Sequence, residues 1–163
     1  QFKLDPSSVD LNPIREDSLL RAEVALEDKY NFFERDSDKT NLVLFPPISG
    51  TLSENFNRDK KHYAVDITAP RDTPIKAVSN GIDIFAEWTT ETGYVIIMEH
   101  KDGLLSVYKH NGSLSKSQGD IVRAGEVIAS VGNTGEFTTG PHLHFELWDN
   151  GNPVNPLDFI DFK

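Results

Sequence analysis

The sequence predicts a mainly β fold, an antiparallel sandwich or barrel, and three observations support that prediction. From residue 42 onward, short runs of β-branched and aromatic residues alternate with Gly, Pro, Asn and Asp, which is typical of strands joined by tight turns. These runs follow one another with no long helical segment between them. The chain has 163 residues and no cysteine, and it is long enough to bury a core without disulfides.

Seven segments carry the strand pattern. The predicted strands are residues 64–68, 75–77, 82–87, 94–100, 104–109, 127–131 and 142–148. The turn signals between or after them are Asn80-Gly81, Asp102-Gly103, Asn111-Gly112, Gly119-Asp120, Gly132-Asn133 and Asn150-Gly151. Because Asp102-Gly103 lies between two predicted strands, it predicts a β-hairpin.

The first part of the chain does not have the strand pattern. Residues 1–41 are predicted to form an N-terminal arm, followed by a domain over residues 42–163. Apolar residues between positions 19 and 30 approximate the spacing of one helix face, which predicts a short N-terminal helical segment over residues 17–33. Asp17 or Ser18 can cap its start, and residues 34–40 read as a charged linker.

The charge balance narrows the choice of partners. The formal net charge is −10, from 26 acidic and 16 basic residues, which argues against a nucleic acid or an anionic membrane surface as the main partner. No run of about 18 apolar residues occurs that could span a bilayer. Because the chain begins with Gln1 rather than Met, we expect a membrane anchor or stalk to precede it in the full-length protein.

The segment Gly140-Pro-His-Leu-His-Phe-Glu-Leu147 contains two histidines one residue apart in a strand-like run. Alternate residues of a strand share a face, so His142 and His144 are predicted to lie side by side, opposite Leu143 and Phe145. Two interpretations stay open, a metal or catalytic site and an ordinary solvated face. Glu146 shares the histidine face, where it either orients a histidine or is a plain exposed glutamate.

His62 and Asp66 form a second candidate pair. In a straight strand they would share one face, with backbones roughly 13 Å apart, and Tyr63, Val65 and Ile67 would face the core on the other side. Side chains so far apart do not reach one metal, so a shared ion requires the chain to bend, with His62 in the entering loop and Asp66 on the strand. The alternative is a surface histidine beside a turn-capping aspartate.

Two further histidines follow predicted strands. His110 comes just before the Asn111-Gly112 turn signal, and strand ends beside loops are common positions for catalytic groups. His100 has a similar place before the predicted hairpin and is interpreted as structural.

In combination and in order, these motifs resemble the lysostaphin/LytM-type zinc metallopeptidases over about residues 45–156. The matching motifs are His62-x-x-x-Asp66, Tyr108-x-His110, the run from Gly119 to Ile128, Gly132-Asn-Thr-Gly135, Gly140-Pro-His-x-His144 and Asn155-Pro156. The resemblance implies a compact antiparallel β structure of the duplicated-hybrid-motif type. It assigns one zinc ion (Zn2+) to His62, Asp66 and His144, and catalysis to His110 and His142.

The resemblance also implies an activity. Family members cleave peptide bonds in peptidoglycan stems or cross-bridges, so we expect a zinc endopeptidase of the cell envelope, periplasmic or extracellular, acting on peptidoglycan peptides. The sequence departs from the family pattern at Ala64, residues 71–72, Tyr94-Val95 and Asn111. None of these positions is an expected ligand or catalytic residue, so the departures concern substrate preference.

Two other functions stay open. A catalytically silent LytM-type regulator or wall-binding module would usually lack ligands, whereas all five positions are filled here. Residues 119–129 resemble the hammerhead turn of lipoyl- and biotin-type barrels, which would suit a carrier domain. A lipoyl carrier needs an exposed lysine at a hairpin tip, and a phosphocarrier leaves His62-x-x-x-Asp66 unexplained.

Overall fold

The computed structural model describes residues 44–132 and 140–162. The chain divides into two units, residues 1–40 and 41–163, and every described residue belongs to the second. The predicted helix over residues 17–33, the charged linker and the domain boundary at residues 41 and 42 lie outside the described residues and stay predictions.

Ten antiparallel strands form one sheet in the described part of the chain. They are β1 (Thr51–Glu54), β2 (Val65–Thr68), β3 (Pro74–Lys76), β4 (Gly81–Thr89), β5 (Gly93–Glu99), β6 (Leu104–Leu114), β7 (Ile121–Val122), β8 (Val127–Val131), β9 (His142–Asp149) and β10 (Asn152–Val154). The main path runs β1-β2-β9-β6-β5-β4-β7, and β10 pairs with β9. Two short 3-10 turns complete the described elements, Lys101–Gly103 and Pro156–Asp158.

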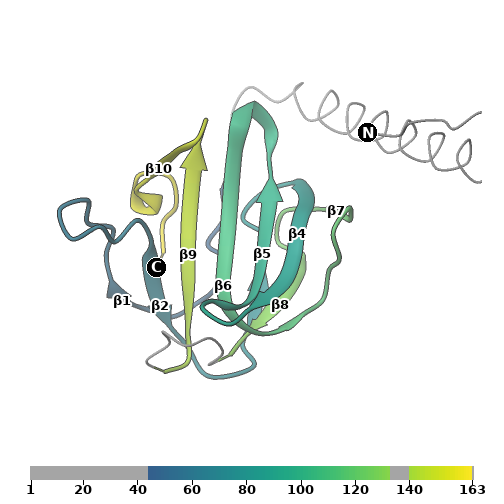
Figure 1. Ribbon diagram of the computed structural model, residues 1–163, viewed down its shortest axis with the longest axis horizontal. Helices are drawn as coiled ribbons and strands as arrows, with labels where there is room; N and C mark the ends of the chain where they lie inside the picture. Colours follow the sequence, from purple (N-terminus) through teal and green to yellow (C-terminus); the bar gives the residue numbers. More distant parts are fainter. Residues whose placement is uncertain (1–43, 133–139, 163) are drawn as a thin grey trace, which may run out of the picture. The chain divides into compact units, whose positions relative to one another are not determined.

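The sheet bends back on itself through strand β6. Its first half pairs with β5 and β9, whereas its second half pairs with β8, which in turn pairs with β3. Figure 1 shows β9, β6, β5 and β4 as one curved layer, flanked by β1 and β2 on one side and by β7 on the other. The predicted mainly β, antiparallel fold is confirmed.

Alternation along β9 separates the core from the opposite face of the sheet. Leu143, Phe145 and Leu147 are completely buried, and each contributes about 1.5–3 kcal/mol by its removal from water. His142, His144 and Glu146 alternate with them and therefore point to the other face. A register slip of one residue would exchange the two sets, so this burial fixes where the histidines point.

The predicted Asn111-Gly112 turn is wrong, because β6 continues through both residues to Leu114. The pairs Ile96↔Tyr108 and Tyr94↔Asn111 leave an extra residue in β6, a β-bulge, and His110 within it has φ 66°. The bulge redirects the strand from β5 to β8 without reversing it. The Asp102-Gly103 hairpin is confirmed between β5 and β6.

The expected core position of Tyr63 is also wrong. The strand begins only at Val65, and Tyr63 in the preceding loop is 36% exposed and packs edge-on against Phe56. Ala64 is buried in its place. No helix among the described residues combines the length and the apolar character needed to cross a membrane.

Candidate metal centre

Strands β2 and β9 bring two of the predicted ligands face to face. They pair antiparallel, with Asp66 directly opposite His144 in the register, so both side chains leave the same face of the sheet. His62 arrives from the loop before β2, where backbone hydrogen bonds of 2.8 and 2.9 Å join Asn57 and His62. The chain bends between His62 and Asp66, as the reach of the two side chains requires.

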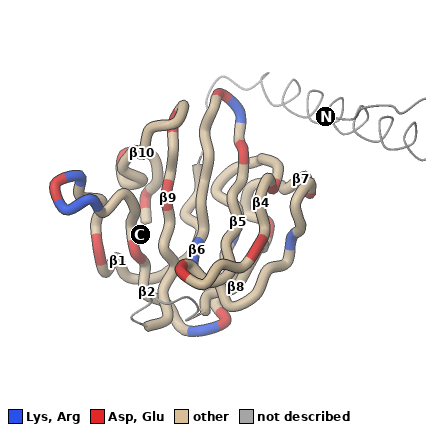
Figure 2. Tube along the Cα trace, in the orientation of Figure 1, with Lys and Arg blue, Asp and Glu red and all other residues tan. Residues whose placement is uncertain are grey.

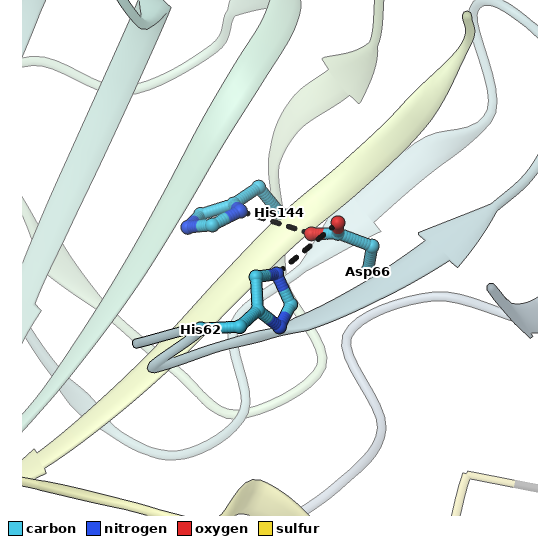
Figure 3. Close-up of side chains that lie close together, drawn as sticks. All are labelled: His62, Asp66 and His144. Carbon is cyan, nitrogen blue, oxygen red and sulfur yellow. Dashed lines mark hydrogen bonds and ion pairs between the residues drawn. The ribbon is translucent and has the colours of Figure 1, made fainter. Parts of the chain in front are cut away.

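The three side chains converge on one point (Figure 3). His144 Nδ1 lies 2.9 Å from Asp66 Oδ1, and His62 Nε2 lies 3.3 Å from Asp66 Oδ2. One ligand atom from each residue lies within 4.8 Å of the others, the spacing of a metal-binding group. Two imidazoles and one carboxylate are the donor set of a catalytic zinc site, which leaves a fourth position open.

The hydrogen bonds of His62 test whether a cation fits there. Its Nδ1 lies 2.9 Å from the Asn55 carbonyl oxygen, so Nδ1–H donates and Nε2 carries the lone pair in the neutral ring. That Nε2 is buried and has no hydrogen-bond partner among the described residues, although it faces a carboxylate oxygen. A lone pair facing an anion needs a cation between or beside them, so the residues present fit a metal ion.

The carboxylates of this cluster are held in the charged form. Burial acts to raise the pKa of Asp66, but the hydrogen bond from His144 and the nearby imidazoles outweigh it and lower the pKa. For His144, burial acts to lower the pKa, but the hydrogen bonds to Asp66 and Glu146 outweigh burial and raise the pKa overall. Asp66 is therefore a carboxylate at neutral pH.

The two remaining histidines lie beside this group. The His110 ring centroid is 5.1 Å from that of His142 and 5.7 Å from that of His144. Both His110 and His142 are mostly buried, at 7% and 9% exposed. His142 Nδ1 lies 2.7 Å from the Gly140 carbonyl oxygen, so Nδ1–H donates and Nε2 carries the lone pair of the neutral ring.

The bulge in β6 sets the position of His110. A non-glycine residue in the left-handed region is strained, and it persists only where its surroundings hold it. The His110 N–H donates to the Thr92 carbonyl at 3.0 Å, and the Asn111 side chain donates to the carbonyls of Tyr94 and Tyr108. Asn111, a departure from the family pattern, thus fastens the bulge that presents His110.

A cavity of about 290 Å³ adjoins the cluster. Asp66 and His142 form one side of it, and its other lining residues are Ser53, Glu54, Thr68, Gly140 and Pro141. A larger cavity of about 520 Å³, lined by Leu52 and residues 157–162, contains none of the five site residues. Of these two cavities, the smaller one borders the cluster.

The structure brings together the five predicted site residues and places His100 elsewhere. His100 is 1% exposed and lies in the interior, with hydrogen-bonding distances of 2.7 Å from each ring nitrogen to the Asn80 carbonyl and the Ser106 hydroxyl. Sequence reasoning missed Lys109 and Trp148, which contact Glu146 beside the cluster. The sequence did contain a signal for Trp148, because it follows Glu146 by two residues and therefore lies on the same strand face.

The sequence of the domain is similar to the sequences of known proteins. Residues 60–156 match Peptidase family M23. Over 96 residues the chain is 42% identical to the DD-carboxypeptidase/endopeptidase Mpg of Neisseria meningitidis, covering 59% of this chain and 22% of that protein. Over 120 residues it is 41% identical to the murein hydrolase activator EnvC of Escherichia coli, covering 71% of this chain and 28% of that protein.

A solved structure extends the match to the fold. The catalytic domain of lysostaphin from Staphylococcus simulans superposes with a TM-score of 0.57 at 32% identity, covering 69% of this chain and 87% of that domain. The chain spans less than a third of the length of the two curated relatives. The predicted likeness to lysostaphin-type peptidases is confirmed, and the chain belongs to peptidase family M23.

Proposed function

We propose that this domain is a zinc-dependent endopeptidase that hydrolyses peptide bonds in peptidoglycan stems or cross-bridges. The observation that carries the proposal is the convergence of His62 Nε2, Asp66 and His144 Nδ1, with the lone pair of His62 facing a carboxylate. Neither a carrier barrel nor a surface histidine pair needs that arrangement. His62, Asp66 and His144 would hold the ion.

The chemistry divides between the ion and the two neighbouring histidines. Bound zinc supplies Lewis acidity, which polarises a carbonyl and acidifies water. His142 has the tautomer of a general base, because its Nδ1–H donates to Gly140 and its Nε2 can take a proton from the attacking water. Water forms the new C–O bond, the C–N bond breaks, and the proton passes to the leaving amine. His110, 5.1 Å from His142, would donate to the tetrahedral oxyanion.

The names of two relatives support the proposed substrate and location. One relative is named a DD-carboxypeptidase/endopeptidase and another a murein hydrolase activator, so both names point to the bacterial wall. Lys and Arg are interspersed with Asp and Glu along the described chain (Figure 2), and the sequence has 26 acidic against 16 basic residues, which disfavours nucleic acid as a partner. We therefore place the protein in the cell envelope, periplasmic or extracellular, with peptidoglycan peptides as substrate.

A second candidate function is regulation of another wall hydrolase. It is favoured by the 41% identity to a protein named an activator. An activator does not require a complete donor set or two histidines beside it. The filled positions His62, Asp66, His144, His110 and His142 therefore favour catalysis over regulation.

The deciding experiment measures zinc and hydrolysis on the same preparation. We expect one equivalent of tightly bound zinc by elemental analysis, and defined muropeptides cleaved into fragments identified by mass. His142→Ala should keep the zinc and lose the hydrolysis. Hydrolysis by His142→Ala at the wild-type level would refute its role as base.

The outcomes separate the two candidates. A protein that stays metal-free after zinc supplementation and leaves all muropeptides intact, yet stimulates a separate wall hydrolase, would be a regulator. A suitable control is Glu87→Gln, since Glu87 is an exposed residue of β4 outside the cluster. It should retain both zinc and activity.

A further inference from the structure

Glu146 lies behind the candidate metal centre and has three hydrogen-bonding partners. Its Oε2 is 2.9 Å from His144 Nε2 and 2.8 Å from Lys109 Nζ, and its Oε1 accepts from Trp148 Nε1–H at 2.8 Å. The residue is only 8% exposed. A buried carboxylate is stable only with such partners, and here all of them are donors or can act as donors.

The sheet fixes each partner separately. His144, Glu146 and Trp148 are alternate residues of β9, so they share one face. Lys109 is directly opposite His144 in the pairing of β6 with β9. The ammonium and the indole therefore hold the carboxylate against His144 from two directions, one across the sheet and one along the strand.

This contact places a proton on the nitrogen of His144 that faces away from Asp66. A carboxylate accepts hydrogen bonds and does not donate them, so the ring must present Nε2–H to Glu146. The other nitrogen, Nδ1, lies 2.9 Å from Asp66 Oδ1, and a metal ion held by both residues would take the lone pair of Nδ1 while Nε2–H stays on Glu146. A histidine ligand needs its lone pair on the metal side, and the nitrogen away from the metal commonly donates to a carboxylate.

We propose that Glu146, held by Lys109 and Trp148, is a positioning residue that fixes the Nε2–H tautomer and the ring orientation of His144, and so sets the zinc affinity of the site. This inference rests on the proposed function and deepens it. Glu146 does not touch the cavity that would take the substrate. Its effect is therefore expected to pass through the metal ligand and not through substrate contacts.

The test compares Glu146→Gln with the matched control Glu87→Gln. Glutamine keeps the shape of the side chain but can turn its amide NH₂ toward the ring, so the Nε2–H tautomer is no longer enforced. We expect zinc affinity, measured by competition with a chelator, to fall about 10–100-fold, the range for loss of an outer partner of a metal ligand. Glu87→Gln should bind zinc like the wild type.

A spectroscopic readout separates positioning from general destabilisation. In the zinc-loaded wild type, long-range ¹H–¹⁵N NMR should report a proton on His144 Nε2 in slow exchange, and Glu146→Gln should lose that protection. Glu146→Asp retains the charge but shortens the side chain, and it should weaken zinc binding even if Glu146→Gln fails to fold. A merely structural role would lower the free energy of unfolding of the metal-free protein and leave the zinc affinity of folded molecules unchanged.

The outcomes are distinguishable from failure of the proposed function. Wild-type zinc affinity and an unchanged His144 resonance in both Glu146 variants would overturn the inference while leaving a zinc peptidase intact. A wild-type protein that binds no zinc would overturn the proposed function first, and this inference with it.

Discussion

Strand β6 separates two polar clusters that use similar residue types in opposite ways. On one face, Lys109 lies beside the carboxylate and imidazoles of the candidate metal centre. On the other face, Ser106 and Tyr108 point into the core, where they join His100. The first cluster contains a buried nitrogen, His62 Nε2, that has no hydrogen-bond partner within residues 44–132 and 140–162. In the second, both His100 nitrogens lie at hydrogen-bonding distance from neighbours.

The polar atoms of the core cluster are partnered by other protein groups. The Val78 N–H and the Ser106 hydroxyl both donate to the Tyr108 hydroxyl, and Ser106 Oγ also lies 2.7 Å from His100 Nε2. His100 Nδ1–H donates to the Asn80 carbonyl. These contacts are all with protein groups, whereas in the candidate metal centre His62 Nε2 has no hydrogen-bond partner among the described residues. The difference between a structural and a functional histidine thus lies in what its nitrogens face, not in its burial.

The carboxylates show the same contrast. The pKa of Glu146 lies at about 2, because its hydrogen bonds to His144 and Lys109 and the Lys109 charge outweigh the effect of burial. Burial raises the pKa of Asp83 in β4 to about 6, since only one of its oxygens accepts a hydrogen bond, from Phe85 N–H, and Asp120 adds a like charge. The surroundings of Glu146 stabilise its charged form, whereas the surroundings of Asp83 destabilise its charged form.

The largest expected effect is the loss of a ligand. His144→Ala removes one of the three proposed zinc donors and leaves the carboxylates of Asp66 and Glu146 without their shared imidazole. Because loss of an outer partner alone costs about 10–100-fold in metal affinity, loss of the ligand should cost more than about 100-fold, with a parallel loss of hydrolysis. Chelator competition measures the affinity. Retention of one equivalent at wild-type affinity would contradict the ligand assignment.

The next effect is a pH dependence of stability from Asp83. Its pKa is about 6 in the folded protein and 3.8 in the unfolded chain, so the folded state binds the proton more tightly. Its contribution is therefore fully present below pH 4 and is lost as the pH rises through about 6. Two pKa units correspond to roughly 3 kcal/mol.

Asp83→Asn isolates the contribution of Asp83 to the pH dependence of stability, because the variant and the wild type share all other titrating groups. The unfolding free energy of the variant relative to the wild type should rise by up to about 3 kcal/mol between pH 4 and pH 8. Urea denaturation at each pH measures it. A difference that stays constant with pH would mean that Asp83 is not held protonated by the core.

Much of this arrangement was predictable from local sequence. Period-two alternation placed Leu143 and Phe145 in the core and His142 and His144 on the opposite face, because burial fixes the register of a strand. The reach of two side chains toward one ion also predicted the bend between His62 and Asp66, which the bridge at Asn57 produces.

The rest depended on contacts distant in sequence. Asn111-Gly112 has the composition of a turn, yet pairing with β8 keeps it in the strand, so local propensity alone gave the wrong answer. Lys109 meets Glu146 only because β6 and β9 pair in one particular register. No local pattern around Lys109 carries that information.

A smaller effect is expected in the core cluster. Tyr108→Phe removes the hydroxyl that accepts from Val78 N–H at 3.2 Å and lies 2.9 Å from the Ser106 hydroxyl. The buried Val78 donor is then unsatisfied, which should lower the free energy of unfolding by about 1–3 kcal/mol. Zinc affinity should not change, because Tyr108 points away from the metal centre. A loss of zinc affinity in the folded variant would show that the two faces of β6 are coupled.

The smallest effect is expected from Trp148→Phe, which removes one of the three partners of Glu146 and keeps an aromatic ring. Lys109 and His144 still hold the other oxygen, Oε2, at 2.8 and 2.9 Å, so the carboxylate should rotate only slightly. One hydrogen bond to a charged group contributes about 1.5–3 kcal/mol, and most of that should appear as a lower free energy of unfolding. Zinc affinity should fall by less than about tenfold, below the range for losing an outer partner outright. If Trp148→Phe weakened zinc binding as much as Glu146→Gln, the indole and not the ammonium would be the main support of the carboxylate.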